Sequence, residues 1–264
     1  MKITRIPVLL FLLAAHGLAW SGFDEGHAAA RKGDYKTALR EWRPLAEQGH
    51  ANAQFNLGLM YEKGHGVPQD SREAVKWYHK AAEQDDADAQ YRLGLINVKG
   101  QDVSQDYKEA MKWFRKAAEQ GMASAQFDLG IMYHAGYGVP RDYKEAVKWY
   151  RKAATKGHVK AQFNLGNMYD DGHGVTQDPK EAMKWYRKAA EQGDTSAQFN
   201  LGVMYGNGGG VPQNYMQAYM WFNIASENGL ADGTTYRDIV ANKMNTAQIS
   251  EAQKLAREWM ETHQ

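Results

Sequence analysis

Apolar residues in the stretch 122–157 recur at intervals of three and four positions, with polar residues between them. Those of the first half are Ala125, Leu129, Met132 and Tyr133, and those of the second half are Ala146, Trp149, Tyr150 and Ala153. Positions at this spacing lie on one face of an α-helix, so the stretch predicts two amphipathic helices. The segment Gly136-Tyr137-Gly138-Val139-Pro140 between them has the composition of a loop. Gly157 fits the C-terminal cap of the second helix.

The same block occurs five times without the gain or loss of a residue. Its glutamine stands at Gln54, Gln90, Gln126, Gln162 and Gln198, and its tryptophan at Trp77, Trp113, Trp149, Trp185 and Trp221. Each series advances by 36 residues, as from 54 to 90. A fixed period of about 20–50 residues is typical of solenoids, in which each repeat buries its apolar face against its neighbours.

Aspartates and glycines recur at fixed places in the predicted helices. An aspartate precedes the second helix with a glutamate three residues on, the spacing of a capping box. These pairs are Asp70 with Glu73, Asp106 with Glu109, Asp142 with Glu145, and Asp178 with Glu181. Each first helix contains a glycine, at Gly58, Gly94, Gly130, Gly166 and Gly202. Because glycine costs ~1 kcal/mol relative to alanine inside a helix, we expect a close approach of the partner helix there.

The ends of the repeat array differ from its middle. Residues 22–49 predict a shorter helix pair, with Gly33-Asp34-Tyr35 in place of the long loop. Trp42 of this pair falls in the slot of Tyr78 and Tyr150. Residues 230–264 lose the sequence pattern, but Ile249, Ala252, Leu255, Ala256 and Trp259 lie on one apolar face. A solenoid needs its last exposed face covered, so we expect a C-terminal capping helix.

The residues at these fixed slots resemble the SEL-like repeat (SLR), a relative of the tetratricopeptide repeat with a longer inner loop. The shared pattern is A-x-x-x-L-G-x-M-Y, then G-x-G-V-x-x-D, then A-x-x-W-Y-x-K-A-A-x-x-G. The resemblance covers 50–229 and implies an all-α fold, a right-handed α-solenoid of antiparallel helix pairs, with an adaptor role in protein complexes. Exported bacterial members are linked to the cell envelope and to host cells. The penicillin binding of cysteine-rich relatives is not carried over, because this chain has no cysteine.

One repeat departs from the shared pattern. Asp85 stands in a capping-glycine slot, Asn97 in a tyrosine slot and Asp102 in a loop-glycine slot. If Gly66, Gly138 and Gly174 adopt a positive φ, Asp102 must tolerate one as well, which aspartate does better than most residues.

The composition limits the classes of function. The 264 residues include 32 lysines and arginines against 31 aspartates and glutamates, whereas nucleic-acid binding usually needs a concentrated basic surface. Without cysteine the chain can form no disulfide and no thiol nucleophile. It also lacks a Gly-x-Ser-x-Gly turn, a phosphate-binding loop and a His-Glu-x-x-His motif. These features predict a protein that is not an enzyme and that uses no cofactor or metal.

The N-terminus predicts a secretory signal peptide. Lys2 and Arg5 precede the apolar run 6–15, and Gly17-Leu18-Ala19 supplies small residues for cleavage after Ala19. The alternative is an uncleaved anchor, although the run is shorter than the ~20 residues of a spanning helix. We expect an exported protein, periplasmic or secreted. The predicted segments are a signal peptide at 1–19, an opening pair at 20–49, repeats at 50–85, 86–121, 122–157, 158–193 and 194–229, and a helical cap at 230–264.

Histidine, tryptophan and basic residues each admit a structural interpretation. His65 and His173 share a loop slot three repeats apart, too far for a common metal, and are expected to face solvent. Asp170-Asp171-Gly172-His173 lacks the ligand spacing of a calcium loop. The five tryptophans have the spacing of core residues. Basic residues form a stripe on the second helices, interspersed with glutamates as on a solvated face: Lys112, Arg115, Lys116, Lys148, Arg151, Lys152, Lys184, Arg187 and Lys188.

The strongest candidate for binding is one variable slot of the first helices. In tetratricopeptide-like solenoids these helices line the concave surface. The slot holds Asn56, Arg92, Asp128, Asn164 and Asn200, and the preceding slot holds Phe55, Tyr91, Phe127, Phe163 and Phe199. Asparagine donates and accepts hydrogen bonds, which suits a peptide backbone. In the alternative interpretation the asparagines satisfy interhelical groups and the phenylalanines belong to the core.

These observations predict a protein-interaction scaffold that binds a protein or peptide on its concave face. We expect a monomer without nucleic-acid binding and without stable membrane insertion. One alternative is a secreted effector that acts on host cells. Another is a cell-wall or penicillin-binding activity, which covalent labelling by a β-lactam would reveal.

Overall fold

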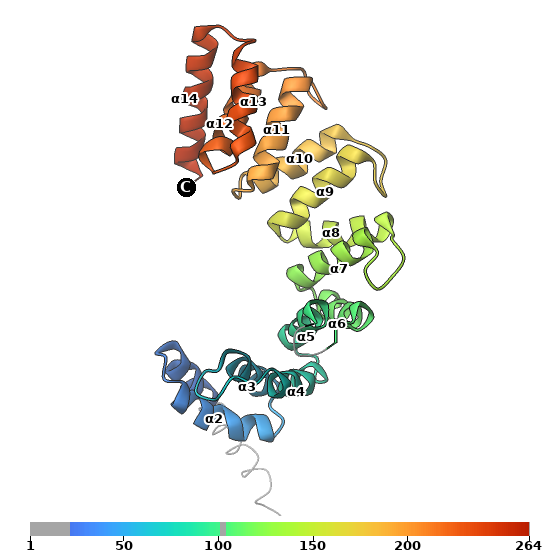
Figure 1. Cartoon of the computed structure of the whole chain (residues 1–264), viewed down its shortest axis with the longest axis vertical. Helices are drawn as coiled ribbons and strands as arrows, with labels where there is room; N and C mark the ends of the chain where they lie inside the picture. The colour runs from blue at the N-terminus through green and yellow to red at the C-terminus, as the bar shows by residue number, and fades with distance from the viewer. Residues whose placement is uncertain (1–21, 101–103, 264) are drawn as a thin grey trace, which may run out of the picture. The chain divides into compact units, whose positions relative to one another are not determined.

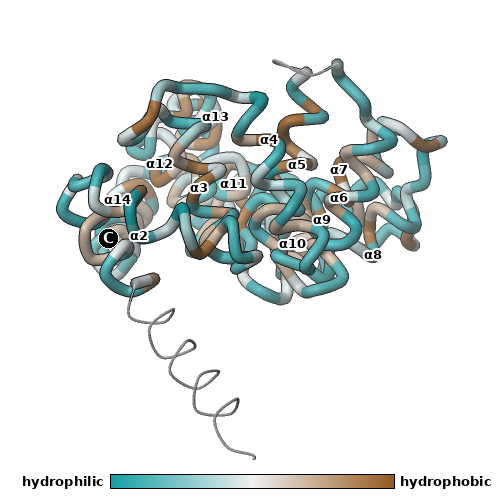
Figure 2. Tube along the Cα trace, turned by 90° about the horizontal axis from the view of Figure 1, so that it is seen from below, coloured by the Kyte–Doolittle hydropathy of each residue, from teal (hydrophilic) through white to brown (hydrophobic). Residues whose placement is uncertain are grey.

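The structure is a computed structural model that describes residues 22–100 and 104–263. Every regular element in these ranges is a helix, which confirms the all-α class (Figure 1). The predicted signal peptide and Asp102 lie outside the described residues. Over those residues, no helix is long and apolar enough to cross a membrane. Figure 2 shows hydrophilic residues between the short hydrophobic stretches of the helices.

Each predicted repeat folds as a helix pair. The first helices are α3 (Ala51–Lys63), α5 (Ala87–Lys99), α7 (Ala123–Ala135), α9 (Val159–Asp171) and α11 (Thr195–Asn207). The second helices are α4 (Ser71–Ala82), α6 (Tyr107–Glu119), α8 (Tyr143–Thr155), α10 (Pro179–Ala190) and α12 (Tyr215–Glu227). An opening pair consists of the helix over residues 22–31 and α2 (Tyr35–Glu47). The last pair is α13 (Ala231–Ala241) and α14 (Thr246–Thr262).

The chain forms two compact units that meet at a repeat boundary. The N-terminal unit ends at Gln120 and the C-terminal unit begins at Gly121. The division therefore falls between α6 and α7, after the second of the five repeats. Within each unit, a first helix packs against the second helix of its own repeat and against the second helix of the preceding pair. This is the packing of an α-solenoid.

The repeated glycine of the first helix is the point where the two helices of a repeat interlock. A Cβ atom added at Gly130 would lie 2.5 Å from Cδ1 of Tyr150. The same approach brings Gly26 to Trp42, Gly58 to Tyr78, Gly94 to Phe114, Gly166 to Tyr186, and Gly202 to Phe222. The expected steric role of the glycine is confirmed. Trp42 takes the place that its slot predicted, so the opening pair interlocks like the other pairs.

The aspartate caps of the second helices form, but the predicted capping boxes are replaced by a different contact. Asp142 Oδ1 accepts from the backbone N–H groups of Lys144 and Glu145, at 2.9 and 3.0 Å. The Glu145 carboxylate instead binds the ammonium of Lys148, 3.0 Å away. The lysine, one turn further on, offers a charged donor that competes with the cap backbone N–H. The capping box that does form lies at Asn245 and Gln248, at the start of α14.

The repeated glutamines join consecutive repeats. Gln162 is buried, and its Nε2 donates to the carbonyl of Ala154 near the end of α8, at 3.2 Å. Its Oε1 accepts from Nε2 of Gln192, beyond α10, at 2.7 Å. The same two bonds join Gln54 to Ala46 and Gln84, Gln90 to Ala82 and Gln120, and Gln198 to Ala190 and Asn228. The sequence analysis used these glutamines only to measure the repeat length, because a sequence pattern does not show which carbonyl group a side chain binds.

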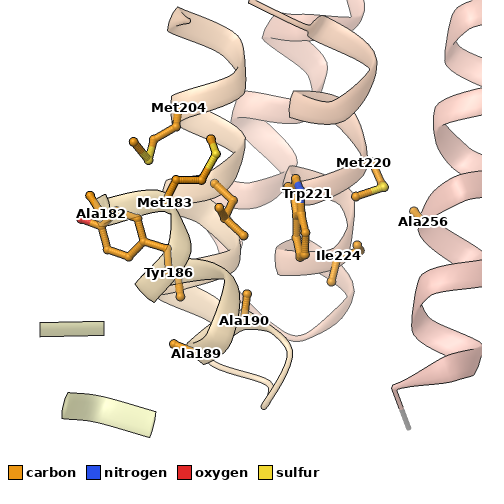
Figure 3. Packing of buried hydrophobic residues seen from close by; sticks show 12 residues of the cluster. Ala182, Met183, Tyr186, Ala189, Ala190, Met204, Met220, Trp221, Ile224 and Ala256 are labelled. Atoms are coloured by element: carbon orange, nitrogen blue, oxygen red, sulfur yellow. The ribbon is translucent and has the colours of Figure 1, made fainter. Parts of the chain in front are cut away.

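Alanine and aromatic residues fill the core of each unit. In the C-terminal unit Tyr186, Trp221 and Ile224 pack among small alanines and methionines (Figure 3). Trp113, Trp149, Trp185 and Trp221 are buried, as predicted, whereas Trp77 is partly buried. Lysine ammonium groups cover several of the indole rings, with Lys152 Nζ 4.0 Å from the ring centroid of Trp149.

The C-terminal segment continues the 36-residue step without the sequence pattern. Helix α13 begins at residue 231, and α11 begins at 195, so the step of 36 is kept. The expected capping helix is α14, whose Ala252 and Ala256 are buried. Helix α13 was not predicted, because Arg237 and Asp238 occupy the slots of leucine and glycine. Figure 1 shows α12, α13 and α14 together at the C-terminal end.

Asp85 is strained by its backbone. Its φ of 63° is the only positive value among the described non-glycine residues. The equivalent Gly157 has a φ of 87°. We expect Asp85→Gly to raise the free energy of unfolding by up to ~1 kcal/mol, because glycine adopts this region without strain. Gly157→Asp is the reverse experiment and should lower it by a similar amount. Urea unfolding of the full chain checks both, and two changes of the same sign would contradict the account.

Candidate functional site

The candidate slot lies on half-buried surface of the first helices in the C-terminal unit. Asp128, Asn164 and Asn200 stand one repeat apart on α7, α9 and α11, and each is partly accessible. The regular 36-residue step places them at equivalent positions of consecutive helices. This surface is hereafter called the amide face, and is made up of these three residues.

Buried tyrosine hydroxyls lie behind the two asparagines of the amide face. The Tyr150 phenol interacts with the side chain of Asn164, and the Tyr186 phenol with that of Asn200. Burial raises the pKa of both phenols far above the ordinary value, and the asparagine amides act in the opposite direction. An amide carries N–H donors and a carbonyl acceptor, so each asparagine can contact its phenol and still hydrogen-bond a partner.

Each phenol is also bound from a second side. Tyr186 Oη donates to Oδ1 of Asn167 at 2.7 Å. Tyr150 Oη lies 3.3 Å from Nδ1 of His134. The orientation of the amide face thus depends on buried groups behind it. The sequence analysis predicted the contact between asparagines and phenols only in general terms, as the alternative in which the asparagines hydrogen-bond groups between the helices.

In the N-terminal unit the same slot is more deeply engaged. Asn56 is buried, and its Nδ2 lies 3.4 Å from Nε2 of His27. Arg92 Nη1 lies 3.3 Å from Oε1 of Glu62, and Oε2 of the same carboxylate accepts from the Tyr78 hydroxyl. Asn56 and Arg92 therefore bind neighbours of their own unit. The slot residues of the two units differ in accessibility and partners.

The preceding aromatic slot is half-buried and belongs partly to the core. Phe163 packs on Tyr186 with ring centroids 5.9 Å apart, and Phe127 packs on Tyr150 at 6.0 Å. Phe55, Tyr91 and Phe199 make the equivalent contacts with Tyr78, Phe114 and Phe222. The rings pack on the interlocking aromatic residues, as the core interpretation expects, and stay partly accessible. Their role as the apolar floor of a binding site stays a prediction.

The prediction that the two loop histidines face solvent is confirmed for His173, which is exposed, whereas His65 is half-buried. His173 stacks on Tyr143 with ring centroids 4.7 Å apart, and His65 stacks on Tyr35 at 4.0 Å. Each loop thus packs on the first residue of the preceding repeat's second helix. No group of three acidic or histidine side chains within the described ranges could hold a metal ion.

Several residues of the basic stripe pair with glutamates on their own helices or with tyrosines on the next first helix. Lys112, Lys148 and Lys184 bind the glutamates three residues before them. Arg151 and Arg187 donate to the hydroxyls of Tyr169 and Tyr205, at 2.5 and 2.8 Å. Both members of this last contact change at the junction of repeats 50–85 and 86–121, where His79 of the first and Asn97 of the second replace the arginine and the tyrosine. These contacts agree with a solvated face that carries structural pairs.

His158 makes the C-terminal unit sensitive to acid. Its Nδ1 accepts from the backbone N–H of Ala161 at the start of α9, and burial lowers the pKa of the imidazole below 6.5. A histidine whose pKa is lower in the folded than in the unfolded protein adds to the free energy of unfolding. This contribution is complete above the pKa of the unfolded state, about 6.5, and decreases as the pH falls below it. Asp194 caps α11 from the same slot. We expect His158→Asp to flatten this decrease in urea titrations between neutral and mildly acidic pH; an unchanged slope would contradict this role.

The repeat pattern, the interlocking glycines and the helix pairs together identify the family. The Sel1 repeat family model matches residues 51–86, 87–122, 123–158, 159–194 and 195–230. A tetratricopeptide repeat model matches residues 23–65, which include the opening pair. The chain belongs to the Sel1 repeat family. Proteins of this family are generally protein-interaction scaffolds, and the fold is typically non-catalytic.

Solved Sel1 repeat proteins are similar to this chain over most of its length. A Sel1 repeat protein from Oxalobacter formigenes is 34% identical, with a TM-score of 0.78, and the match covers 88% of this chain and 98% of that one. The protective antigen c5321, present in uropathogenic Escherichia coli strains and displaying an SLR fold, is 41% identical with a TM-score of 0.76. That match covers 87% of this chain and 50% of the antigen.

Similarity to a curated relative is confined to a short segment. The DAP3-binding cell death enhancer 1 of Rattus norvegicus is 40% identical over 45 residues. This segment is 17% of the Sel1 repeat chain and 9% of the rat protein. The match is therefore little longer than one 36-residue repeat.

Proposed function

We propose that this Sel1 repeat protein is a non-enzymatic scaffold that binds an extended peptide segment of a partner along its amide face. The Asn164 and Asn200 amides carry the proposal, because they lie against buried phenols and stay partly accessible at equivalent positions of two consecutive first helices. Each carbonyl can accept from a peptide N–H. A group that is already oriented loses little conformational freedom on binding, which favours affinity.

Asp128 extends the amide face with an acceptor of higher charge. A carboxylate accepts hydrogen bonds and donates none when ionised. The face thus presents oxygen acceptors on α7, α9 and α11, with the aromatic slot beside them as an apolar contact. A peptide backbone supplies N–H donors at regular intervals, which makes an extended segment a suitable occupant.

The proposed site of action is the bacterial envelope or the medium. The apolar run and Gly17-Leu18-Ala19 motivate this location. The similarity to a protein described as a protective antigen supports the same view, since an antigen must be accessible to the host. Action as a secreted effector on host cells is the second candidate function. Detection of the protein in culture medium would favour the effector; retention in the periplasm would favour an envelope scaffold.

Site-specific photo-crosslinking in the producing cell tests the binding face. Lys160 and Ser196 are exposed one helical turn before Asn164 and Asn200, and residues four apart share a helix face. A photoreactive amino acid at either position should give a discrete adduct with a partner. The same group at exposed Lys152 or Lys188 on the second helices is the matched control. Adducts at the control positions with none at the first helices would contradict the proposal.

Removal of the N-terminal segment is a separate prediction. We expect cleavage after Ala19, so the exported protein should begin at Trp20. Intact-mass spectrometry of protein from the envelope and the medium measures this directly. A stable species that retains Met1 would contradict cleavage and the proposed export.

A further inference from the structure

A small apolar pocket opens near the C-terminal end of the C-terminal unit. It lies between α11, α12 and α13, has a volume of about 270 Å³, and is lined by Val203, Phe222 and Val240 among others. Tyr236 and Ile239 stand beside it with 43% and 53% of their surface exposed. They are two of the three large hydrophobic residues that are exposed over the described ranges. Figure 1 shows the three helices side by side.

Three replacements at repeat slots create this pocket. Phe222, in the lining, stands where Tyr186 stands one repeat earlier, so this slot contributes no phenol oxygen to the pocket. Gly206 stands in the slot of Asp170 and provides space instead of a carboxylate. Tyr236 follows Asn200 by 36 residues, so an aromatic ring replaces an amide. The polar amide face therefore ends in an apolar site.

The size and charge of the pocket indicate its occupant. A volume of about 270 Å³ is at the lower end of the ~300–1,000 Å³ of small-molecule sites, and suits one large aliphatic side chain. Lys243 is the only charged residue in the lining, and it has no ion-pair partner in the described part of the chain. An acidic group next to the aliphatic side chain would complement this ammonium.

We propose that this pocket anchors the bound peptide by taking up an aliphatic side chain, with an adjacent acidic side chain facing Lys243. The inference rests on the proposed function, because it gives the peptide of the amide face a fixed end. It goes beyond that function in naming the side chains that the partner presents.

Methyl NMR with capped dipeptides tests the pocket without knowledge of the partner. The probes are the N-acetyl, C-amide forms of Leu-Glu, Leu-Lys and Ser-Glu, titrated at millimolar concentration into the full chain with labelled isoleucine methyl groups. The Ile239 methyl signal should shift on addition of Leu-Glu. Its affinity should exceed that of Leu-Lys by about two- to fivefold, the range expected from one exposed ion pair. Ser-Glu should cause no saturable shift.

Ile131 and Lys243→Glu provide the matched controls. Ile131 stands in the same slot as Ile239 three repeats earlier, on α7, and its methyl signal should stay in place. Lys243 is exposed, so Lys243→Glu should leave the fold intact and reverse the preference toward Leu-Lys. The wild-type titration alone is decisive if the variant fails to fold.

Several outcomes would overturn the pocket assignment. The assignment would be wrong if the Ile239 methyl signal did not shift with either leucyl probe. It would also be wrong if the Ile131 signal shifted equally, or if Leu-Glu and Leu-Lys bound with equal affinity. A dimer in sedimentation that Ile239→Asp dissociates would assign the patch to a second copy of this chain. The crosslinking experiment is independent of these results. Adducts at Lys160 without a shift of the Ile239 signal would support the peptide scaffold and reject the pocket. Adducts confined to the second helices, together with a shift of the Ile239 signal, would reject the amide face as the binding surface.

Discussion

Gly202→Ala should destabilise the C-terminal unit, although alanine is the better helix former. The added Cβ would lie 2.6 Å from Cδ1 of Phe222, a separation that real Cβ contacts essentially never show. Phe222 is buried and has little room to move. Relief requires α11 and α12 to separate, and overpacking of this kind costs about 1–3 kcal/mol. Urea unfolding of the full chain, followed by circular dichroism, should show the loss.

Gly206→Ala is the matched control on the same helix. A Cβ at Gly206 would meet only Cβ of Ala218, 3.7 Å away, which is an ordinary contact. This variant should be neutral or more stable by roughly 0.5–1 kcal/mol, because alanine loses less backbone entropy in a helix. Opposite signs for the two variants identify the steric role of the repeated glycine. A stable Gly202→Ala protein would show that the helices of the pair can move apart at little cost.

Gln198→Leu should cost about 1–3 kcal/mol. The leucine removes the donor to the Ala190 carbonyl and the acceptor for Asn228, so this carbonyl keeps only its bond from the Gly193 backbone N–H. A hydrogen bond of this kind contributes about 0.5–1.5 kcal/mol, and two such bonds are lost. Hydrogen exchange should also show faster opening at the junction of α10 and α11, where the glutamine joins the two repeats.

Asn228→Ala separates the two bonds of this glutamine. Asn228 is exposed, so its loss leaves no buried group unsatisfied except the Gln198 oxygen. We expect a smaller effect than that of Gln198→Leu. Equal effects of the two variants would mean that the Gly193 N–H alone satisfies the Ala190 carbonyl, and the bond from the glutamine to this carbonyl would then contribute little.

The repeat sequence predicts helices well because three signals agree in it. The spacing of Ala125 and Leu129 gives the helical face, Asp142 gives the start of the second helix, and Gly157 gives its end. Local signals of this kind act within one or two helical turns. The repeat length also placed Trp42 correctly, because Trp42 stands 36 residues before Tyr78.

Contacts between repeats could not be predicted in the same way. The partners of Gln162, at Ala154 and Gln192, lie on different elements, and the phenols behind Asn164 and Asn200 are buried on the preceding repeat. Helix α13 was missed because the packing surface of α12 fixes it, whereas its own residues break the pattern. The pocket beside Tyr236 could not be foreseen for the same reason, since it arises from residues on three helices.

The central claim is that the amide face binds the partner, and the affinity for that partner tests it most directly. The partner is the crosslinked protein, measured by titration calorimetry against the wild-type chain. Asn164→Leu with Asn200→Leu should weaken binding at least tenfold, while Lys148→Gln with Lys152→Gln on the second helix should leave it unchanged. Equal circular dichroism melting curves would show that both variants are folded. Unchanged affinity in the asparagine variant, together with lost affinity in the lysine variant, would contradict the account.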